Sequence, residues 1–226
     1  MTKYPITLAI DTAQACCQCA LIDADGTSYS MSEARARGHA EHLMDQIDAL
    51  LDNSQREYDD LERIVVASGP GSFTGLRVGL AAARGLAVAL DIPCLGIPTL
   101  LALSLSGREN SPLSVLIDAR RDQHYRQDFS APGKPISEPK AFENINALDG
   151  FTAQSRVLGS GAEWAASECG AHNVELARDP DMRTFLNVVK MAEFGQLADP
   201  NHFPPEPCYL RAADAKPQSA KQIARR

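Results

Sequence analysis

The chain has 226 residues, of which 44% are hydrophobic and 23% are charged, a mixture typical of one large or two small globular domains. Its 29 acidic and 22 basic residues give a formal net charge of −7, which argues against a protein that holds nucleic acid by itself. Only six mostly apolar residues precede Asp11, too few for a signal sequence, and no later segment offers eighteen uncharged apolar residues. The sequence therefore predicts a soluble, cytoplasmic protein with no membrane segment.

Six cysteines are spread over the chain, and we interpret them as reduced thiols of the core rather than as a disulfide framework. The group Cys16-Cys17-x-Cys19 alternates as a strand does and has no second cysteine pair or nearby histidine, which makes it a poor zinc site. The other three are Cys94, Cys169 and Cys208.

The first half of the chain is predicted to form three antiparallel strands, a helix, a strand and a second helix. Asp25-Gly26 predicts the turn between the second and third strands. Apolar residues recur at helical spacing in the first helix, at Leu43, Ile47, Leu50 and Leu51. The expected strands cover residues 6–11, 16–23, 27–33 and 63–68, and the expected helices cover residues 39–52 and 75–90.

A polar, turn-rich stretch at residues 107–112 predicts a boundary between an N-terminal half, residues 1–108, and a C-terminal half, residues 109–226. Each half opens with a strand that ends on an aspartate, Asp11 or Asp118, which indicates an α/β protein built by duplication. We expect an edge strand at residues 92–97, a short helix at 99–106 and strands at 114–118, 124–129 and 156–159. Residues 130–150 are expected to form a loop, with an edge strand inside it as the alternative. Helices are expected at 162–169 and 182–197, and an extended tail at 204–211.

The glycine-rich loop at residues 69–75 lies between a strand and a helix, where free N–H groups and the positive end of the helix dipole can hold an anion. Its spacing matches neither a Walker A loop nor a dinucleotide-binding fingerprint. The alternative is a tight connection in which Ser72 or Thr74 caps the helix.

Asp11 and Thr12, at the end of the first strand, carry groups that can hold a phosphate-bound metal, but the residues alone favour the alternative, hydrogen bonds within a turn. The corresponding feature in the second half is Asp118 with Arg120 and Arg121, for which a surface ion cluster is the alternative.

The helix at residues 75–90 has a face of very small side chains, which include Gly75, Gly79, Ala82 and Ala83. Each glycine costs a helix about 1 kcal/mol relative to alanine, so close packing must compensate. The packing partner is either this chain or a helix of another chain, and the pattern alone favours neither.

The sequence indicates no catalytic residue and no metal site. His39 and His42 stand three residues apart at a helix start, but no third ligand follows, and the motifs HExxH and GxSxG are absent.

Several segments resemble, in order, the bacterial TsaB (YeaZ) family: LAIDTAQACCQCALID at 8–23, GHAEHL at 38–43, SGPGSFTGLRVGLAAARGLA at 68–87, GIPT at 96–99, IDARRDQHY at 117–125 and CYLRAADAKP at 208–217. The resemblance implies an actin/Hsp70/sugar-kinase-like (ASKHA) fold of the α/β class with two ribonuclease-H-like halves. It also implies a non-catalytic subunit that scaffolds TsaD and the TsaE ATPase. That complex forms the threonylcarbamoyl group on N6 of adenosine 37 in tRNAs that read codons beginning with A.

The resemblance assigns two groups of residues. The family's dimerisation surface corresponds to His39, Leu43, Ile47, Leu50, Gly75, Gly79, Ala83 and Leu86. The phosphate side of the nucleotide cleft of catalytic relatives, vestigial here, corresponds to Asp11, Thr12, Gly69, Gly71, Ser72 and Thr74.

The resemblance further implies a heterodimer with TsaD, a homodimer in isolation, tRNA contact only through the complex, no intrinsic cofactor, and ATP or ADP at the boundary with TsaD. His39-x-x-His42 departs by one residue from the His-x-x-x-His pair of TsaD-like proteins, which argues against independent transferase activity.

Two alternatives stay open. One is a small-molecule kinase or ATPase of the same fold, with magnesium on Asp11 and phosphates on the loop at residues 69–74. The other is direct tRNA binding through Arg120, Arg121, Arg126, Lys221, Arg225 and Arg226, which conflicts with the net charge of −7.

Overall fold

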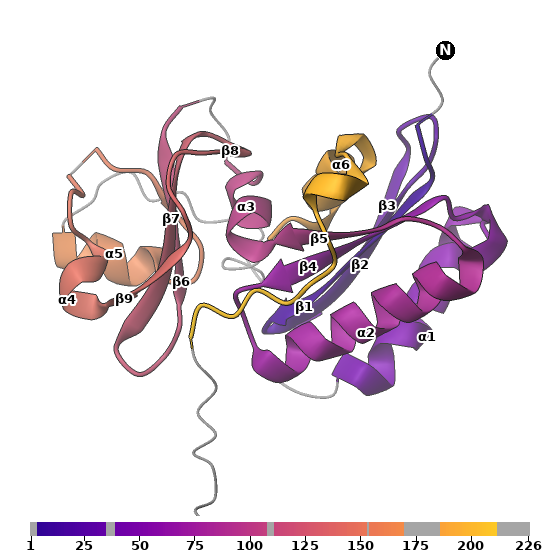
Figure 1. Ribbon diagram of the computed structural model, residues 1–226, viewed down its shortest axis with the longest axis horizontal. Coiled ribbons are helices and arrows are strands. Elements are labelled where there is room, and N and C mark those ends of the chain that lie inside the picture. The colour runs from indigo at the N-terminus through magenta and orange to yellow at the C-terminus, as the bar shows by residue number, and fades with distance from the viewer. Residues whose placement is uncertain (1–3, 35–38, 108–110, 153, 170–185, 212–226) are drawn as a thin grey trace, which may run out of the picture.

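Two five-stranded sheets, each covered by helices, make up the computed structural model, which describes residues 4–34, 39–107, 111–152, 154–169 and 186–211 (Figure 1). The first sheet has the strand order β3-β2-β1-β4-β5. Its strands are β1 (Thr7–Gln14), β2 (Cys16–Ile22), β3 (Ser28–Ala34), β4 (Arg63–Gly69) and β5 (Cys94–Pro98). The predicted three-stranded meander and the predicted edge strand are both confirmed, since β1, β2 and β3 are antiparallel and β5 runs parallel to β4 at the edge.

The central strands of the first sheet are apolar throughout because both of their faces are covered. In β4, Ile64 and Val66 face the helices α1 (His39–Ser54) and α2 (Phe73–Leu90). Val65 faces the opposite side, where α6 (Val188–Leu197) packs on the sheet. The period of two along the strand therefore divides the first half into two cores.

The second sheet has the order β10-β6-β7-β8, with β9 also paired to β7. Its elements are β6 (Leu113–Asp118), β7 (Gln123–Ala131), β8 (Lys134–Pro135), β9 (Lys140–Glu143), α4 (Asn144–Ala147), β10 (Val157–Leu158) and α5 (Ala162–Cys169). Val115 and Phe129 share one buried core with Val65 and with Leu100 of α3 (Thr99–Ser104), so the two halves pack against each other.

Several expected elements have other bounds in the structure, for example α3, which ends at Ser104 rather than at residue 106. The expected helix at 182–197 begins at Val188, because the side chain of Asn187 accepts from the backbone N–H of Lys190 at 3.1 Å and caps it; residues 182–185 lie outside the described part. The second helix starts at Phe73 rather than at residue 75. The expected loop at 130–150 contains β8, β9 and α4.

The chain returns to the first half after its second sheet. Although α6 lies beyond residue 108, the Nη1 of Arg63 donates to the carbonyl oxygens of Gly195 and Ala198 at 2.7 and 2.9 Å, which ties the end of α6 to β4. Gly195 allows this close approach, since a methyl group there would collide with Val65. The two halves of the fold are therefore not two uninterrupted stretches of sequence.

Candidate functional site

The residues predicted for the phosphate side of a nucleotide cleft do come together at the end of β1. The backbone N–H of Ser72 donates to the carbonyl oxygen of Ala13 at 2.7 Å, and a side chain at Gly71 would collide with that carbonyl. The glycine loop therefore lies directly on the chain that follows Asp11 and Thr12, a position set by backbone contact.

Asp11 is fully buried, and both of its carboxylate oxygens are occupied by protein donors. One oxygen accepts from the backbone N–H of Ala13 at 2.8 Å and the other from Nε2 of Gln18 at 2.9 Å. The same Gln18 nitrogen donates to the carbonyl oxygen of Leu186 at 3.0 Å. Burial raises the pKa of Asp11 to about 6, and the two hydrogen bonds oppose that shift. In this structure the carboxylate links β1, β2 and the chain that leads into α6.

The hydroxyls of this region also serve local structure. Thr12 is buried and donates to the carbonyl oxygen of Gly75 at 2.7 Å. Ser72 caps α2 by accepting from the backbone N–H of Gly75 at 3.3 Å, which decides between the two predicted capping residues; Thr74 is exposed within the helix's first turn. Nucleotide binding by these residues stays a prediction.

The corresponding aspartate of the second half is the last residue of β6, where the β6–β7 turn begins. The exposed Asp118 accepts from the backbone N–H of Arg120 at 2.7 Å, and its own N–H donates to Oγ of Ser160 at 2.9 Å. Arg120, Arg121 and Asp122 all have positive φ, at 59°, 54° and 56°. Turn geometry therefore accounts for the spacing that resembled a second site.

The residues predicted for the partner interface are mostly buried within this chain, and their contact with a partner stays a prediction. Most of them fill the first half's own core between the helices and the sheet: Leu43, Ile47, Leu50, Gly75, Gly79 and Ala83. A methyl group at Gly79 would lie 2.5 Å from Oγ1 of Thr12, and one at Gly75 would collide with the carbonyl oxygen of Thr12. The small-residue face thus packs against β1. Leu86 is half-buried, and the side chain of His39 is outside the described part.

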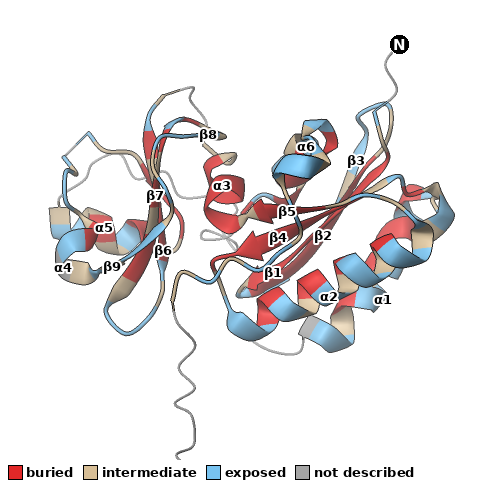
Figure 2. Ribbon diagram, in the orientation of Figure 1, coloured by how far each residue is buried: buried red, intermediate tan, exposed pale blue. Residues whose placement is uncertain are grey.

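The outer side of the same two helices is largely exposed (Figure 2). It carries a different set of apolar residues. Met44 of α1 is 39% exposed and Phe73 of α2 is 48% exposed. Between them lies a groove of about 480 Å³, called here the α1–α2 groove, lined by Ala40, Leu43, Met44, Phe73, Thr74, Arg77, Val78, Ala81 and Ala82. The guanidinium of Arg77 stacks over the ring of Phe73 at 3.8 Å. On these two helices, the face turned outward is this one, and its contact with a partner stays a prediction.

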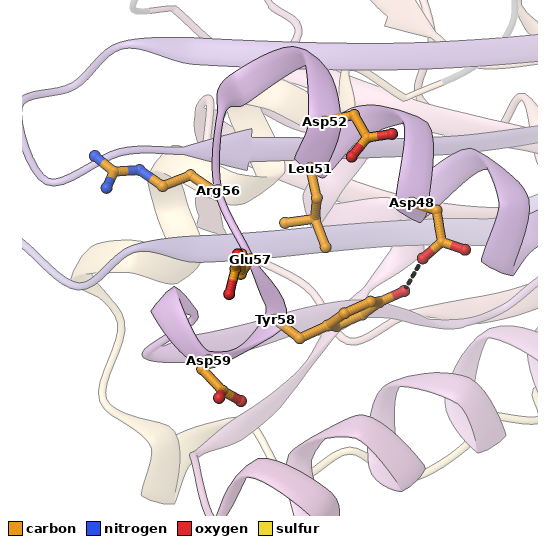
Figure 3. Close-up of a pocket in the computed structure, with 7 residues that line it drawn as sticks. All are labelled: Asp48, Leu51, Asp52, Arg56, Glu57, Tyr58 and Asp59. Atoms are coloured by element: carbon orange, nitrogen blue, oxygen red, sulfur yellow. Dashed lines mark hydrogen bonds between the residues drawn. The ribbon is translucent and has the colours of Figure 1, made fainter.

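A second hollow, of about 420 Å³, lies at the C-terminal end of α1 and is mostly acidic (Figure 3). It is lined by Asp48, Leu51, Asp52, Arg56, Glu57, Tyr58 and Asp59. The phenol of Tyr58 donates to Asp48 at 2.6 Å, and burial together with that carboxylate raises the pKa of the phenol. Arg56 is directed to Asp23, with Nε to Oδ2 at 3.0 Å. The hollow is a solvated acidic surface beside the end of α1.

Within the described ranges, no group of three histidine, cysteine, aspartate or glutamate residues is placed to hold a metal, and all six cysteines are free thiols. By length and composition alone, α2 would suffice to cross a membrane, a test that core helices of soluble proteins also pass, and here it packs against β1 and β4.

Comparison with known proteins adds the family. A family model described as "TsaD: tRNA N6-adenosine threonylcarbamoyltransferase" matches residues 31–176. The chain is 35% identical over 125 residues to the tRNA threonylcarbamoyladenosine biosynthesis protein TsaB of Escherichia coli, covering 54% of each chain. It is 37% identical over 143 residues to the protein of the same name from Bacillus subtilis, covering 63% of this chain and 62% of that one. The matched region thus spans little more than half the length of these relatives.

Solved structures show the fold. The crystal structure of an uncharacterized protein with similarity to peptidase YEAZ from Pseudomonas aeruginosa matches with a TM-score of 0.77 at 21% identity, covering 92% of this chain and all of that one. YeaZ from the same organism matches with a TM-score of 0.75, also at 21% identity, covering 91% of this chain and all of that one. The predicted fold class is confirmed: the chain has the ASKHA fold of the α/β class, with two ribonuclease-H-like halves. The family model covers well over half of the chain, and the chain therefore belongs to the family that it describes and, within it, to the TsaB (YeaZ) proteins.

Proposed function

We propose that this chain is a non-catalytic partner of TsaD in the formation of the threonylcarbamoyl group on N6 of adenosine 37 in tRNAs, and that it acts in the cytoplasm. The names of the E. coli and B. subtilis relatives support a role in threonylcarbamoyladenosine biosynthesis. The net charge of −7 supports a role in which the partner, rather than this chain, holds the tRNA.

The observation that carries the partner role is the α1–α2 groove. Met44 and Phe73 are large apolar side chains that stay exposed on either side of the groove. They lie on the outer side of a helix pair whose inner faces are already packed. Arg77 adds a cation beside an aromatic ring, a combination enriched at protein interfaces. A helical surface of TsaD is the occupant that we propose for this groove.

The surroundings of Asp11 support the absence of independent catalysis. A carboxylate that holds magnesium must be within reach of the ion and its substrate, whereas Asp11 is fully buried and each of its oxygens accepts a hydrogen bond inside the protein. Opening this site to a metal and a nucleotide would require Gln18 to move, and Gln18 also holds Leu186. Binding of TsaE, and of ATP or ADP at the boundary with TsaD, remains an expectation from the family resemblance.

Reconstitution tests the proposal. TsaC, TsaD, TsaE, threonine, bicarbonate, ATP and tRNA are combined with and without this chain, and modified adenosine is quantified. We expect modification only when the chain is present and no ATP turnover by the chain alone. Modification without the chain, together with ATP turnover that Asp11→Asn abolishes, would instead support the kinase or ATPase alternative.

The groove is tested with a matched pair of charge substitutions on the helices that form it. Met44→Glu places a carboxylate in the α1–α2 groove, whereas Val88→Glu places one on α2 at a position that is 83% exposed and outside the groove. We expect Met44→Glu to weaken TsaD binding at least tenfold, since a buried unpaired charge costs more than about 1.4 kcal/mol. Val88→Glu should bind normally. Equal affinities of the two variants in calorimetry would refute the assignment of this groove.

A further inference from the structure

The extended segment that follows α6, residues 203–211, joins three parts of the molecule (Figure 1). It begins at the edge of the first sheet, where the backbone N–H of Gly96 in β5 donates to the carbonyl oxygen of Phe203 at 2.9 Å. A methyl group at Gly96 would lie 2.6 Å from the carbonyl oxygen of Pro204, so the segment lies closely against β5. The prolines of this stretch predict its extended conformation but not these contacts.

The segment then crosses the glycine loop. The backbone N–H of Cys208 donates to the carbonyl oxygen of Ser68 at 2.7 Å, at the end of β4. Gly69 has a φ of +106°, and a methyl group there would lie 2.6 Å from the carbonyl oxygen of Cys208. Ligands of open α/β sheets bind at the carboxyl ends of the parallel strands. At β4 the protein's own chain occupies that edge.

Tyr209, the next residue, contacts two residues that line the α1–α2 groove. Its ring lies 5.5 Å from that of Phe73, and its hydroxyl accepts from Nε of Arg77 at 3.3 Å. The groove and the segment therefore share a stack in which Arg77, Phe73 and Tyr209 contact one another.

Two residues further on, Arg211 contacts the second half. Its Nε donates to Oε1 of Gln123 at 3.0 Å, and its Nη2 donates to the carbonyl oxygen of Arg120 at 3.2 Å. Arg120 lies in the β6–β7 turn, where Arg120, Arg121 and Asp122 have positive φ, and Gln123 is the first residue of β7, directly after that turn. One short segment thus holds the groove at Tyr209 and the turn at Arg211.

We propose that residues 203–211 form a strap that couples the β6–β7 turn of the second half to the α1–α2 groove of the first. This inference rests on the proposed function for the identity of the groove's occupant. A partner that restrains Phe73 and Arg77 also restrains Tyr209, and through Arg211 it restrains the turn. Coupling of this kind is reciprocal. If partner binding favours one conformation of the turn by a given factor, the partner binds that conformation more tightly by the same factor.

Hydrogen exchange on the full chain, free and bound to TsaD, tests the coupling. Binding should slow the exchange of the amides of residues 119–123 in the wild-type protein, and Tyr209→Ala should remove this protection. Leu197→Ala is the control, because that side chain is 69% exposed on α6, outside the strap. Protection that persists in Tyr209→Ala would overturn the strap, since it would mean that the turn responds to the partner by another route.

A second measurement needs no partner. Arg211→Ala removes contacts made only to the second half, yet it should speed exchange of the amides at residues 73–77 about two- to tenfold, the factor expected when an aromatic pair is loosened. Unchanged exchange at residues 73–77, in a variant whose circular dichroism matches that of the wild type, would overturn the coupling. The two proposals can fail separately. If Met44→Glu leaves the affinity for TsaD unchanged, TsaD is not the occupant of the groove, and amide exchange in Arg211→Ala still tests the strap.

Discussion

Three glycines of α2 have different surroundings, and substitution by alanine should separate them. Gly75 and Gly79 face Thr12, whereas nothing lies within 4 Å of a methyl group at Gly85. We expect Gly75→Ala to lower the free energy of unfolding by about 3 kcal/mol or more, because its methyl group meets backbone, and Gly79→Ala by about 1–3 kcal/mol. Gly85→Ala should raise it by about 0.5–1 kcal/mol through helix propensity. Urea denaturation followed by circular dichroism measures all three.

The contact between Gly79 and Thr12 can be isolated with a double-mutant cycle. The methyl group of Gly79→Ala would meet Oγ1 of Thr12, so part of its cost should disappear in a Thr12→Ala background. Additive effects would show that the helix is displaced as a whole and that Thr12 is not the obstacle. Copurification with TsaD is a poor readout for Gly79 and Ala83, because bulky residues there disrupt this chain's own core.

Asp11 should give the protein a stability component that depends on pH. Burial raises its pKa from 3.8 to about 6, so between these values the folded state binds more protons than the unfolded state. The free energy of unfolding of the wild type, relative to Asp11→Asn, should therefore rise as the pH falls from 7 to 4, by up to about 3 kcal/mol. Below pH 3.8 the difference should level off. A relative stability that falls over this range would mean that Asp11 is stabilised as the anion.

At the scale of elements, Arg63 determines how firmly α6 holds to the first sheet. Its Nη1 donates to the carbonyl oxygens of Gly195, Gln196 and Ala198, which the end of a helix leaves without partners. We expect Arg63→Met to cost about 2 kcal/mol, the value of hydrogen bonds from a charged donor. Exchange of the amides of α6 should accelerate.

Arg84→Met is the control for this prediction, since Arg84 is exposed on α2 and its removal deletes a charge without breaking a helix end. If both variants lose the same stability, net charge rather than the bonds to α6 explains the effect. If Arg63→Met changes the free energy of unfolding but leaves amide exchange in α6 unchanged, the hydrogen bonds of Arg63 do not stabilise the helix itself.

Most elements were predictable because their signals are local. The turn at Asp25-Gly26, the helical stripe of Leu43 and Ile47 and the apolar run of β4 each lie within a few residues, and the predicted α5 agrees with the structure at both ends. The direction of the small-residue face was not predictable, because glycines let a helix approach a strand or another helix equally well. Asp11 is linked through Gln18 to Leu186, and Gln18 and Leu186 are 168 residues apart in sequence. Contacts between such distant residues leave no local pattern, and the strap was not predictable for the same reason.

At the scale of the whole molecule, the sequence order and the spatial halves differ. The chain builds the first sheet, then the second, and then returns with α6 and residues 203–211 to cover the first. This return adds long-range contacts to the first sheet, because α6 packs on its strands and residues 203–211 hydrogen-bond to β5 and to the end of β4. A protein with the fold of an enzyme can therefore act as a subunit that supplies a binding surface and no catalytic residues.

The isolated chain should self-associate through the α1–α2 groove. Without TsaD, the exposed Met44 and Phe73 favour pairing with a second copy, and a two-fold arrangement allows each groove to cover the other. We expect sedimentation velocity to show a concentration-dependent dimer, Met44→Glu to be monomeric, and Val88→Glu to dimerise like the wild type. A dimer that survives Met44→Glu would use another surface, and TsaD would then not compete with it. If the same groove serves both partners, adding TsaD must dissolve the homodimer, because one surface cannot be covered twice.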